Sequence, residues 1–117
     1  MPDDAATVLD IVLACRRIGR FIADSDQSSF LDDEREQWAV VSQLTLIGEA
    51  AKRLSEEFRN QHPSIPWPQV MGMRNRLVHQ YDKIDWPLVW MTACRDIPKL
   101  LESLEPFVAE DENNETN

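Results

Sequence analysis

Apolar residues recur every three or four positions along most of this chain, which is the spacing of one buried face of an α-helix. The pattern predicts helices over residues 4–23, from residue 32 to about residue 60, from residue 67 to about residue 79, and from Asp85 onward. We find no alternation typical of a half-buried strand, no internal repeat and no hairpin turn signal. The sequence therefore predicts an all-α fold, an up-and-down bundle of four to five helices.

Capping residues and prolines define the expected helix ends. Ser29 or Asp32 should cap the long second helix, and Asp85 the fourth, because their side chains accept hydrogen bonds from the free N–H groups of a first turn. Pro98 lies inside the last helix and lacks an amide proton, so we expect a kinked last helix. Pro106 is expected to end it.

The chain is expected to form one bundle domain over residues 1–108. Residues 109–117 add four acids and no base, and no apolar residue follows Ala109. Such a composition favours an acidic, disordered tail.

Two helices carry features that indicate close contacts. In the first, Leu9, Leu13 and Phe21 widen the apolar stripe beyond what one neighbouring helix needs, which suggests that a second subunit covers part of it. In the second, Gly48 lies in mid-helix, where the missing side chain permits another backbone to approach closely.

Charge and length limit the function classes. The chain has 117 residues and a net charge of −9, of which −5 remains when the last nine residues are left out. An acidic body argues against a broad nucleic-acid-binding surface, and we expect no DNA partner. A small basic pocket could still hold small anionic ligands, or single-stranded RNA at a few phosphates. No apolar run approaches the ~20 residues of a membrane span, and the N-terminus is acidic, so we expect a cytoplasmic protein without membrane contact.

Cys15 and Cys94 stand alone, without a second cysteine or a histidine at metal-ligand spacing. They predict two buried, reduced thiols. The acids at residues 32–36 are commonplace at a helix start, so we expect no metal site and no cofactor.

Polar groups of three chemistries interrupt the apolar stretch of residues 67–86. Within eight positions lie Arg74, Asn75, Arg76, His79 and Tyr81. On a regular helix Arg74 and His79 point ~140° apart, whereas Asn75 and His79 share a face. Arg74 and His79 can converge in two ways: the helix unwinds near His79, or a two-fold partner supplies a second copy of the set.

These residue types suit the cleavage of RNA without metal. A histidine can take and give a proton near neutral pH, and an arginine can hold a phosphate and stabilise charge that builds on it. Ordinary roles are also open on spacing alone, an ion pair for Arg74 and a place at the helix C-terminus for His79. Possible additional contacts to RNA phosphates are Arg76, Lys83, Lys52 and Arg53, although the last two would more simply lie on a solvated helix face.

The arrangement Arg74-Asn75-x3-His79-x-Tyr81 resembles the motif of the HEPN superfamily, and in particular the R-x4-H-x-Y form of HepT-like ribonuclease toxins. The resemblance extends over roughly residues 38–104. It implies a HEPN fold, a homodimer in which two motifs line one cleft, and a metal-independent endoribonuclease with Arg74, Asn75 and His79 as catalytic residues. It also implies the toxin of a type VII HEPN/MNT toxin–antitoxin system.

The same resemblance implies a protein partner. In such systems a nucleotidyltransferase antitoxin of the MNT type neutralises the toxin by attaching AMP to the motif tyrosine, here Tyr81. The alternative is a non-catalytic HEPN subunit that binds nucleotide or substrate within a nucleotidyltransferase complex. The intact set of Arg74, Asn75 and His79 favours the nuclease.

Overall fold

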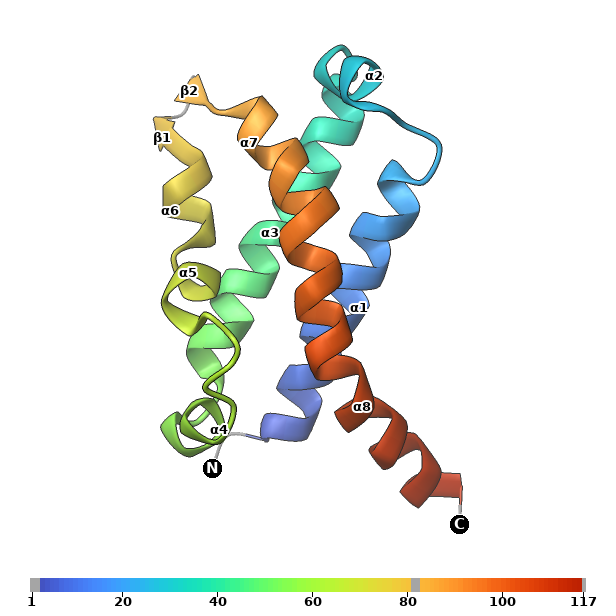
Figure 1. Cartoon of the computed structure of the whole chain (residues 1–117), viewed down its shortest axis with the longest axis vertical. Coiled ribbons are helices and arrows are strands. Elements are labelled where there is room, and N and C mark those ends of the chain that lie inside the picture. Colours follow the sequence, from blue (N-terminus) through green and yellow to red (C-terminus); the bar gives the residue numbers. More distant parts are fainter. Residues whose placement is uncertain (1–2, 81–82, 117) are drawn as a thin grey trace.

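Three long helical segments run side by side along the molecule, and a fourth, broken segment lies against one of them (Figure 1). The structure, a computed structural model, describes residues 3–80 and 83–116. Its elements are α1 (Asp4–Ile22), α2 (Gln27–Leu31), α3 (Glu34–Arg53), α4 (Glu56–Gln61), α5 (Trp67–Met71), α6 (Met73–Leu77), β1 (Val78–Gln80), β2 (Lys83–Ile84), α7 (Trp86–Met91), the π-helical turn η1 (Thr92–Asp96) and α8 (Ile97–Thr116). The predicted all-α bundle is confirmed, with α7, η1 and α8 as its last segment.

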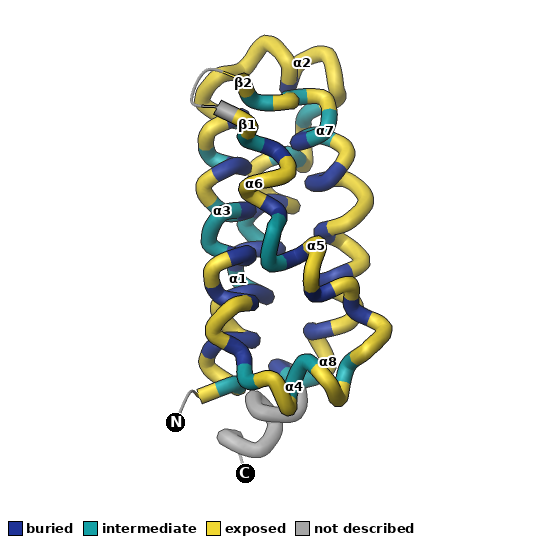
Figure 2. Tube along the Cα trace, turned by 90° about the vertical axis from the view of Figure 1, so that its left-hand side faces the viewer, coloured by how far each residue is buried: buried dark blue, intermediate teal, exposed yellow. Residues whose placement is uncertain are grey.

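The core lies between α1, α3 and α8, and dark, buried positions follow the inside of the bundle in Figure 2. The predicted stripe of α1 is buried, with Ile11, Val12 and Ile18 fully enclosed. Leu9 and Phe21, which widen that stripe, are 38% and 40% exposed. This chain alone therefore leaves part of the apolar face of α1 uncovered.

The single long helix predicted from residue 32 to residue 60 is wrong, because the chain forms two helices there, α3 and α4. Asp33, rather than Ser29 or Asp32, caps α3 by accepting a hydrogen bond from the Glu36 amide. After α3, Leu54 turns to an extended conformation and Ser55 caps α4. The Asp4 carboxylate accepts hydrogen bonds from the Ser55 amide at 2.9 Å and hydroxyl at 2.6 Å. These contacts stabilise the break, which helical periodicity does not reveal.

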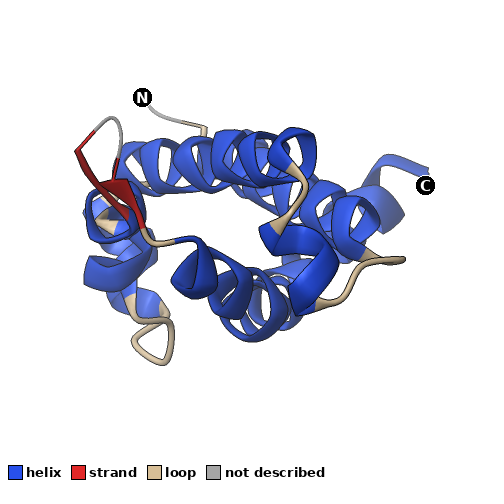
Figure 3. Ribbon diagram, turned by 90° about the horizontal axis from the view of Figure 1, so that it is seen from above, coloured by secondary structure: helices blue, strands red, loops and turns tan. Residues whose placement is uncertain are grey.

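The third predicted helix is also divided, and it ends earlier than expected. Gly72 separates α5 from α6, and α6 ends at Leu77 rather than near His79. The chain then forms a small antiparallel hairpin, β1–β2, although no strand was expected. Seen from above, the hairpin lies at the edge of the helices and adds no layer to the bundle (Figure 3).

Gly48 confirms the expected close approach of two backbones. A Cβ atom at this position of α3 would lie 3.3 Å from the carbonyl oxygen of Val70 and 3.5 Å from that of Met71. The end of α5 can therefore pack directly on α3, and this contact positions the α5–α6 segment.

The last segment departs from a regular helix just before Pro98. Asp85 caps α7 as predicted, accepting a hydrogen bond from the Leu88 amide at 3.0 Å. The Ile97 amide bonds to the Thr92 carbonyl five residues back, a π-type bond that widens the turn ahead of the proline ring. The expected irregularity is therefore present, as a π-helical turn. Pro106 does not end the helix, because α8 continues to Thr116.

The division into residues 1–108 and an acidic tail stays a prediction. Within the described ranges, no helix is both long enough and apolar enough to span a membrane.

The close approach at Gly48 predicts a difference between two glycine substitutions. Gly48→Val should lower the free energy of unfolding by about 1–3 kcal/mol, because its side chain would meet backbone carbonyls that cannot rotate away. Gly19→Ala in α1 is the control. Its Cβ would have no neighbour within 4 Å, so it should raise stability by roughly 0.5–1 kcal/mol. Thermal and urea unfolding followed by circular dichroism would measure both, and equal stability of Gly48→Val and wild type would contradict the close contact.

Candidate active site

The short helix α6 presents polar residues because its two ends are anchored in the core. Met73 and Leu77, one helical turn apart, are 3% and 1% exposed. The three residues between them, Arg74, Asn75 and Arg76, are exposed. Since residues four apart share a helix face, burial of the two ends turns the intervening side chains outward. Figure 2 views the molecule from this side, with exposed positions along α6.

His79 lies beyond the helix, in the hairpin. Val78 is extended, with φ −116° and ψ 99°, and β1 pairs with β2 through Val78 opposite Ile84 and Gln80 opposite Lys83. Two steps along β1 therefore match one step along β2, so His79 is the extra residue of a β-bulge. The chain does unwind before His79, and the ~140° divergence expected on a regular helix does not apply.

Arg74, Asn75 and His79 have no partners among the described residues. None of the three side chains takes part there in an ion pair or a hydrogen bond, and all three are exposed. The surface ion pair that would explain Arg74 in an ordinary way is thus absent from the described part of the chain. The end of α6 and the hairpin together present a guanidinium, an amide and an imidazole that are available to an anionic ligand.

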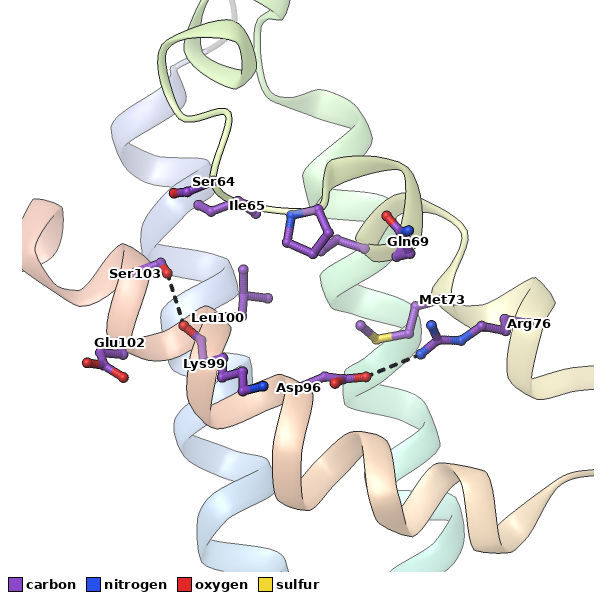
Figure 4. A pocket seen from close by; sticks show the side chains of 12 residues that line it. Ser64, Ile65, Gln69, Met73, Arg76, Asp96, Lys99, Leu100, Glu102 and Ser103 are labelled. Atoms are coloured by element: carbon purple, nitrogen blue, oxygen red, sulfur yellow. Dashed lines mark hydrogen bonds and ion pairs between the residues drawn. The ribbon is translucent and has the colours of Figure 1, made fainter.

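Arg76 faces a different part of the molecule. Its Nη2 atom lies 3.4 Å from a carboxylate oxygen of Asp96 and 3.4 Å from the hydroxyl of Thr92, both in η1. Residues two apart on a helix point about 160° apart, which accounts for the separation of Arg76 from Arg74. Arg76 lies at the edge of a cavity of about 620 Å³ between α5 and α8 (Figure 4). Arg74, Asn75 and His79 do not line that cavity.

Of the other predicted phosphate contacts, one lies near His79 and two lie far from it. Lys83 is exposed on β2, in the same hairpin as His79. Lys52 and Arg53 lie at the C-terminal end of α3, at the other end of the bundle from the hairpin (Figure 1). Lys52 pairs with Glu49 at 3.4 Å, and Arg53 with Asp10 at 3.9 Å. Tyr81 lies outside the described residues.

The bulge at His79 was missed from sequence. A three-residue strand is too short to show alternation, and the available signals, β-branched Val78 and Ile84 on either side of a polar turn, are weak by themselves.

Comparison with known proteins identifies the family of this chain. The family model described as Ribonuclease HepT-like matches residues 11–107, which include the whole set from Arg74 to Tyr81. The chain belongs to this HepT-like ribonuclease family, within the HEPN superfamily. No solved structure matches it.

Two HepT-like relatives illustrate the similarity. A Methanocaldococcus jannaschii protein named as a putative RNase is 33% identical over 103 residues, which cover 88% of this chain and 94% of the relative. A Thermococcus cleftensis protein named as a probable ribonuclease HepT is 38% identical over 96 residues, covering 82% of this chain and 87% of the relative. The similarity therefore spans nearly the whole length of both relatives.

The two thiols of this HepT-like chain are poor candidates for nucleophiles. Burial raises the pKa of Cys15 to about 12. Partial burial raises the pKa of Cys94, against the opposing effect of the neighbouring Arg95 guanidinium. Both groups are therefore protonated at neutral pH, and the thiol is the unreactive form. Cys94 is exposed, which corrects the prediction that both thiols are buried.

No group of three or more His, Cys, Asp and Glu side chains in the described ranges could hold a metal ion.

The contrast between the thiols is testable by alkylation. Iodoacetamide at pH 8.5 should modify Cys94 in the folded protein and leave Cys15 intact. The Cys15 side chain is buried, and pH 8.5 lies far below the pKa of its thiol. In 8 M urea both should react. Mass spectrometry of peptides would measure the two sites, and rapid modification of Cys15 under native conditions would contradict its burial.

Proposed function

We propose that this chain is a metal-independent endoribonuclease of the cytoplasm, the toxin of a type VII HEPN/MNT toxin–antitoxin system. The observation that carries the proposal is the end of α6 at Leu77, which places His79 in a bulge just beyond exposed Arg74 and Asn75. Membership of the ribonuclease HepT-like family and the names of the relatives support the RNase activity.

The proposed chemistry is a transesterification within the RNA strand. Neutral His79 takes the proton of a 2′-hydroxyl, and the oxygen attacks the adjacent phosphorus. A second, protonated imidazole gives a proton to the departing 5′-oxygen. The products are a 2′,3′-cyclic phosphate and a 5′-hydroxyl, so no water and no metal ion enters this step. Arg74 stabilises the charge that develops on the phosphoryl oxygens, and the Asn75 amide donates a hydrogen bond to the same group.

A homodimer would supply the second imidazole, since each chain has one His79. A two-fold axis near the hairpin would place both copies of the motif in one cleft. Exposed Leu9 and Phe21 on α1 support association with a second chain, because each leaves apolar surface in water.

Regulation would act on the same cleft. Tyr81 follows His79 by two residues, and we propose it as the acceptor of AMP from a nucleotidyltransferase partner. The phosphate of attached AMP would occupy the position at which Arg74 holds the RNA phosphate. Being tethered, it would compete with RNA at a high effective concentration.

Removal of either the His79 imidazole or the Arg74 guanidinium should strongly slow cleavage. His79→Ala and Arg74→Ala should each lower the rate of RNA cleavage by about 10²–10⁴-fold, because each loses a group that acts in the transition state. Matched controls are His62→Gln and Arg35→Ala, which change the same residue types outside the motif and should keep the activity. The rate of cleavage of a labelled RNA would measure this. Equal cleavage by His79→Ala and wild type would refute the nuclease and favour a non-catalytic subunit.

The proposed dimer should bury more than about 1,000 Å² of surface, as stable biological interfaces do. Sedimentation at micromolar concentration should therefore give twice the mass of the 13.5 kDa chain. A monomer under these conditions would contradict the two-imidazole mechanism.

Co-expression with the cognate nucleotidyltransferase should add whole AMP masses to the chain, all on Tyr81. Tyr81→Phe lacks the acceptor hydroxyl, so it should stay unmodified and should inhibit growth even when the partner is present. Intact-mass spectrometry and growth assays would measure these outcomes. AMP on a serine or threonine, or neutralisation of Tyr81→Phe by covalent AMP, would refute the assignment.

A further inference from the structure

The hairpin, α2, the start of α3 and the start of α7 lie at the same end of the bundle (Figure 1). Residues of these elements line a hollow of about 260 Å³. Its lining comprises Leu31, Asp32, Glu34, Gln37, Trp38, Ile84 and Trp86. It shares no residue with the proposed catalytic set. Through Ile84 of β2, however, it adjoins the strand pair that carries His79.

One wall of the hollow is aromatic. Trp38 and Trp86 form a T-shaped pair with ring centroids 5.5 Å apart, and Trp86 in turn contacts Phe30 of the core. Trp38 nevertheless stays 45% exposed. An indole ring that stays this exposed is available for contact with a cation.

The rim of the hollow is acidic. Asp32 and Glu34 line it, and no basic side chain does. Within the described residues, neither carboxylate takes part in an ion pair. Asp33 between them is already engaged, because its carboxylate caps α3. The hollow therefore offers two unneutralised carboxylates next to an open indole ring.

The base of the hollow offers a further acceptor. Gln37 is 6% exposed, and its amide nitrogen donates to the carbonyl oxygens of Phe30 and Leu31, each at 3.0 Å. Two carbonyl acceptors require the nitrogen to face them, which fixes the orientation of the amide. Its oxygen accepts no hydrogen bond from the described residues, although the side chain lines the hollow. No buried side-chain nitrogen or oxygen among the described residues lacks a hydrogen-bond partner, so this oxygen is open to solvent and free to accept a hydrogen bond from a ligand.

We propose that this hollow binds an arginine side chain of a partner protein. A guanidinium is planar, stacks on indole and carries five N–H donors, which matches the Trp38 face, the two carboxylates and the Gln37 oxygen. Exposed Leu31 beside Trp38 supplies apolar surface for the residues that flank the arginine.

Other occupants fit the hollow less well. RNA phosphates would be repelled by Asp32 and Glu34. A second copy of this chain, docked by two-fold symmetry at the same surface, would bring two acidic rims together. We identify the partner as the nucleotidyltransferase, an assignment that rests on the proposed function. Docked on the hollow, it would touch the hairpin between whose strands Tyr81 lies in the sequence.

The binding of a guanidinium is tested with N-acetyl-arginine methylamide as the probe. Titration of the isotope-labelled protein should shift the NMR signals of the Trp38 indole and the Ile84 amide. The citrulline analogue is almost identical in shape but uncharged, and it should leave them in place. Asp32→Asn/Glu34→Gln should lose the response, whereas Asp24→Asn/Glu57→Gln, an equal change in charge elsewhere, should keep it. Equal shifts with citrulline, or shifts confined to other tryptophans, would overturn the proposal.

The identity of the partner is tested with the same variants. The affinity of the cognate nucleotidyltransferase should fall at least tenfold for Asp32→Asn/Glu34→Gln and for Trp38→Ala, and should be unchanged for the control pair. Unchanged affinity in all variants would overturn the assignment of the partner. Dissociation of a homodimer by Asp32→Asn/Glu34→Gln would instead identify a second copy as the occupant and likewise overturn it.

RNA cleavage, measured on the same proteins, separates this proposal from the proposed function. It should be equal in wild type and Asp32→Asn/Glu34→Gln. A wild-type protein that cuts no RNA but shows the arginine-specific shifts would refute the nuclease and leave the arginine site standing.

Discussion

The end of α6 at Leu77 is the constraint on which the candidate site depends, and Asp85 fixes it from two sides. The Asp85 amide donates a hydrogen bond to the Leu77 carbonyl at 3.1 Å, which closes the hairpin onto the helix end. The Asp85 carboxylate at the same time caps α7 through the Leu88 amide. One residue therefore joins the end of one helix to the start of the next, and the segment between them leaves the helical path.

The consequence for the site is a change in direction. A continuous helix would separate Arg74 from His79 by a large angle and would leave the imidazole near the next turn. With the helix ended and His79 in a bulge, the guanidinium and the imidazole belong to different elements that meet at one end of the bundle. Core packing of Met73 and Leu77 holds this arrangement, since it fixes the rotation of α6. Gly48 contributes from a distance, because α5 lies close to α3 only where no side chain intervenes.

The sequence predicted the helical bundle and the identity of the polar set, but not the local path of the chain around that set. Periodicity reports which face of a helix is buried, so it located α1 and the α7–α8 segment. It does not report breaks that depend on partners distant in sequence, such as the Asp4 carboxylate at Ser55. Arg76 illustrates the same limit. Its place beside Arg74 suggested a second phosphate contact, whereas the π-helical turn before Pro98 brings Asp96 and Thr92 to its guanidinium. The aromatic and acidic hollow at Trp38 was likewise invisible, since its residues come from two stretches far apart in the sequence, 31–38 and 84–86.

We propose that an imidazole and a guanidinium, without metal, cleave RNA by attack of its own 2′-hydroxyl. The most direct measurement is the chemistry of the RNA ends produced by the purified protein in excess EDTA. We expect undiminished cleavage, with 2′,3′-cyclic phosphate on one fragment and 5′-hydroxyl on the other. Loss of cleavage in EDTA would show that a metal ion is needed. Products that carry 5′-phosphate and 3′-hydroxyl would show that a water molecule, rather than the 2′-hydroxyl, is the nucleophile. Either result would contradict the proposed mechanism.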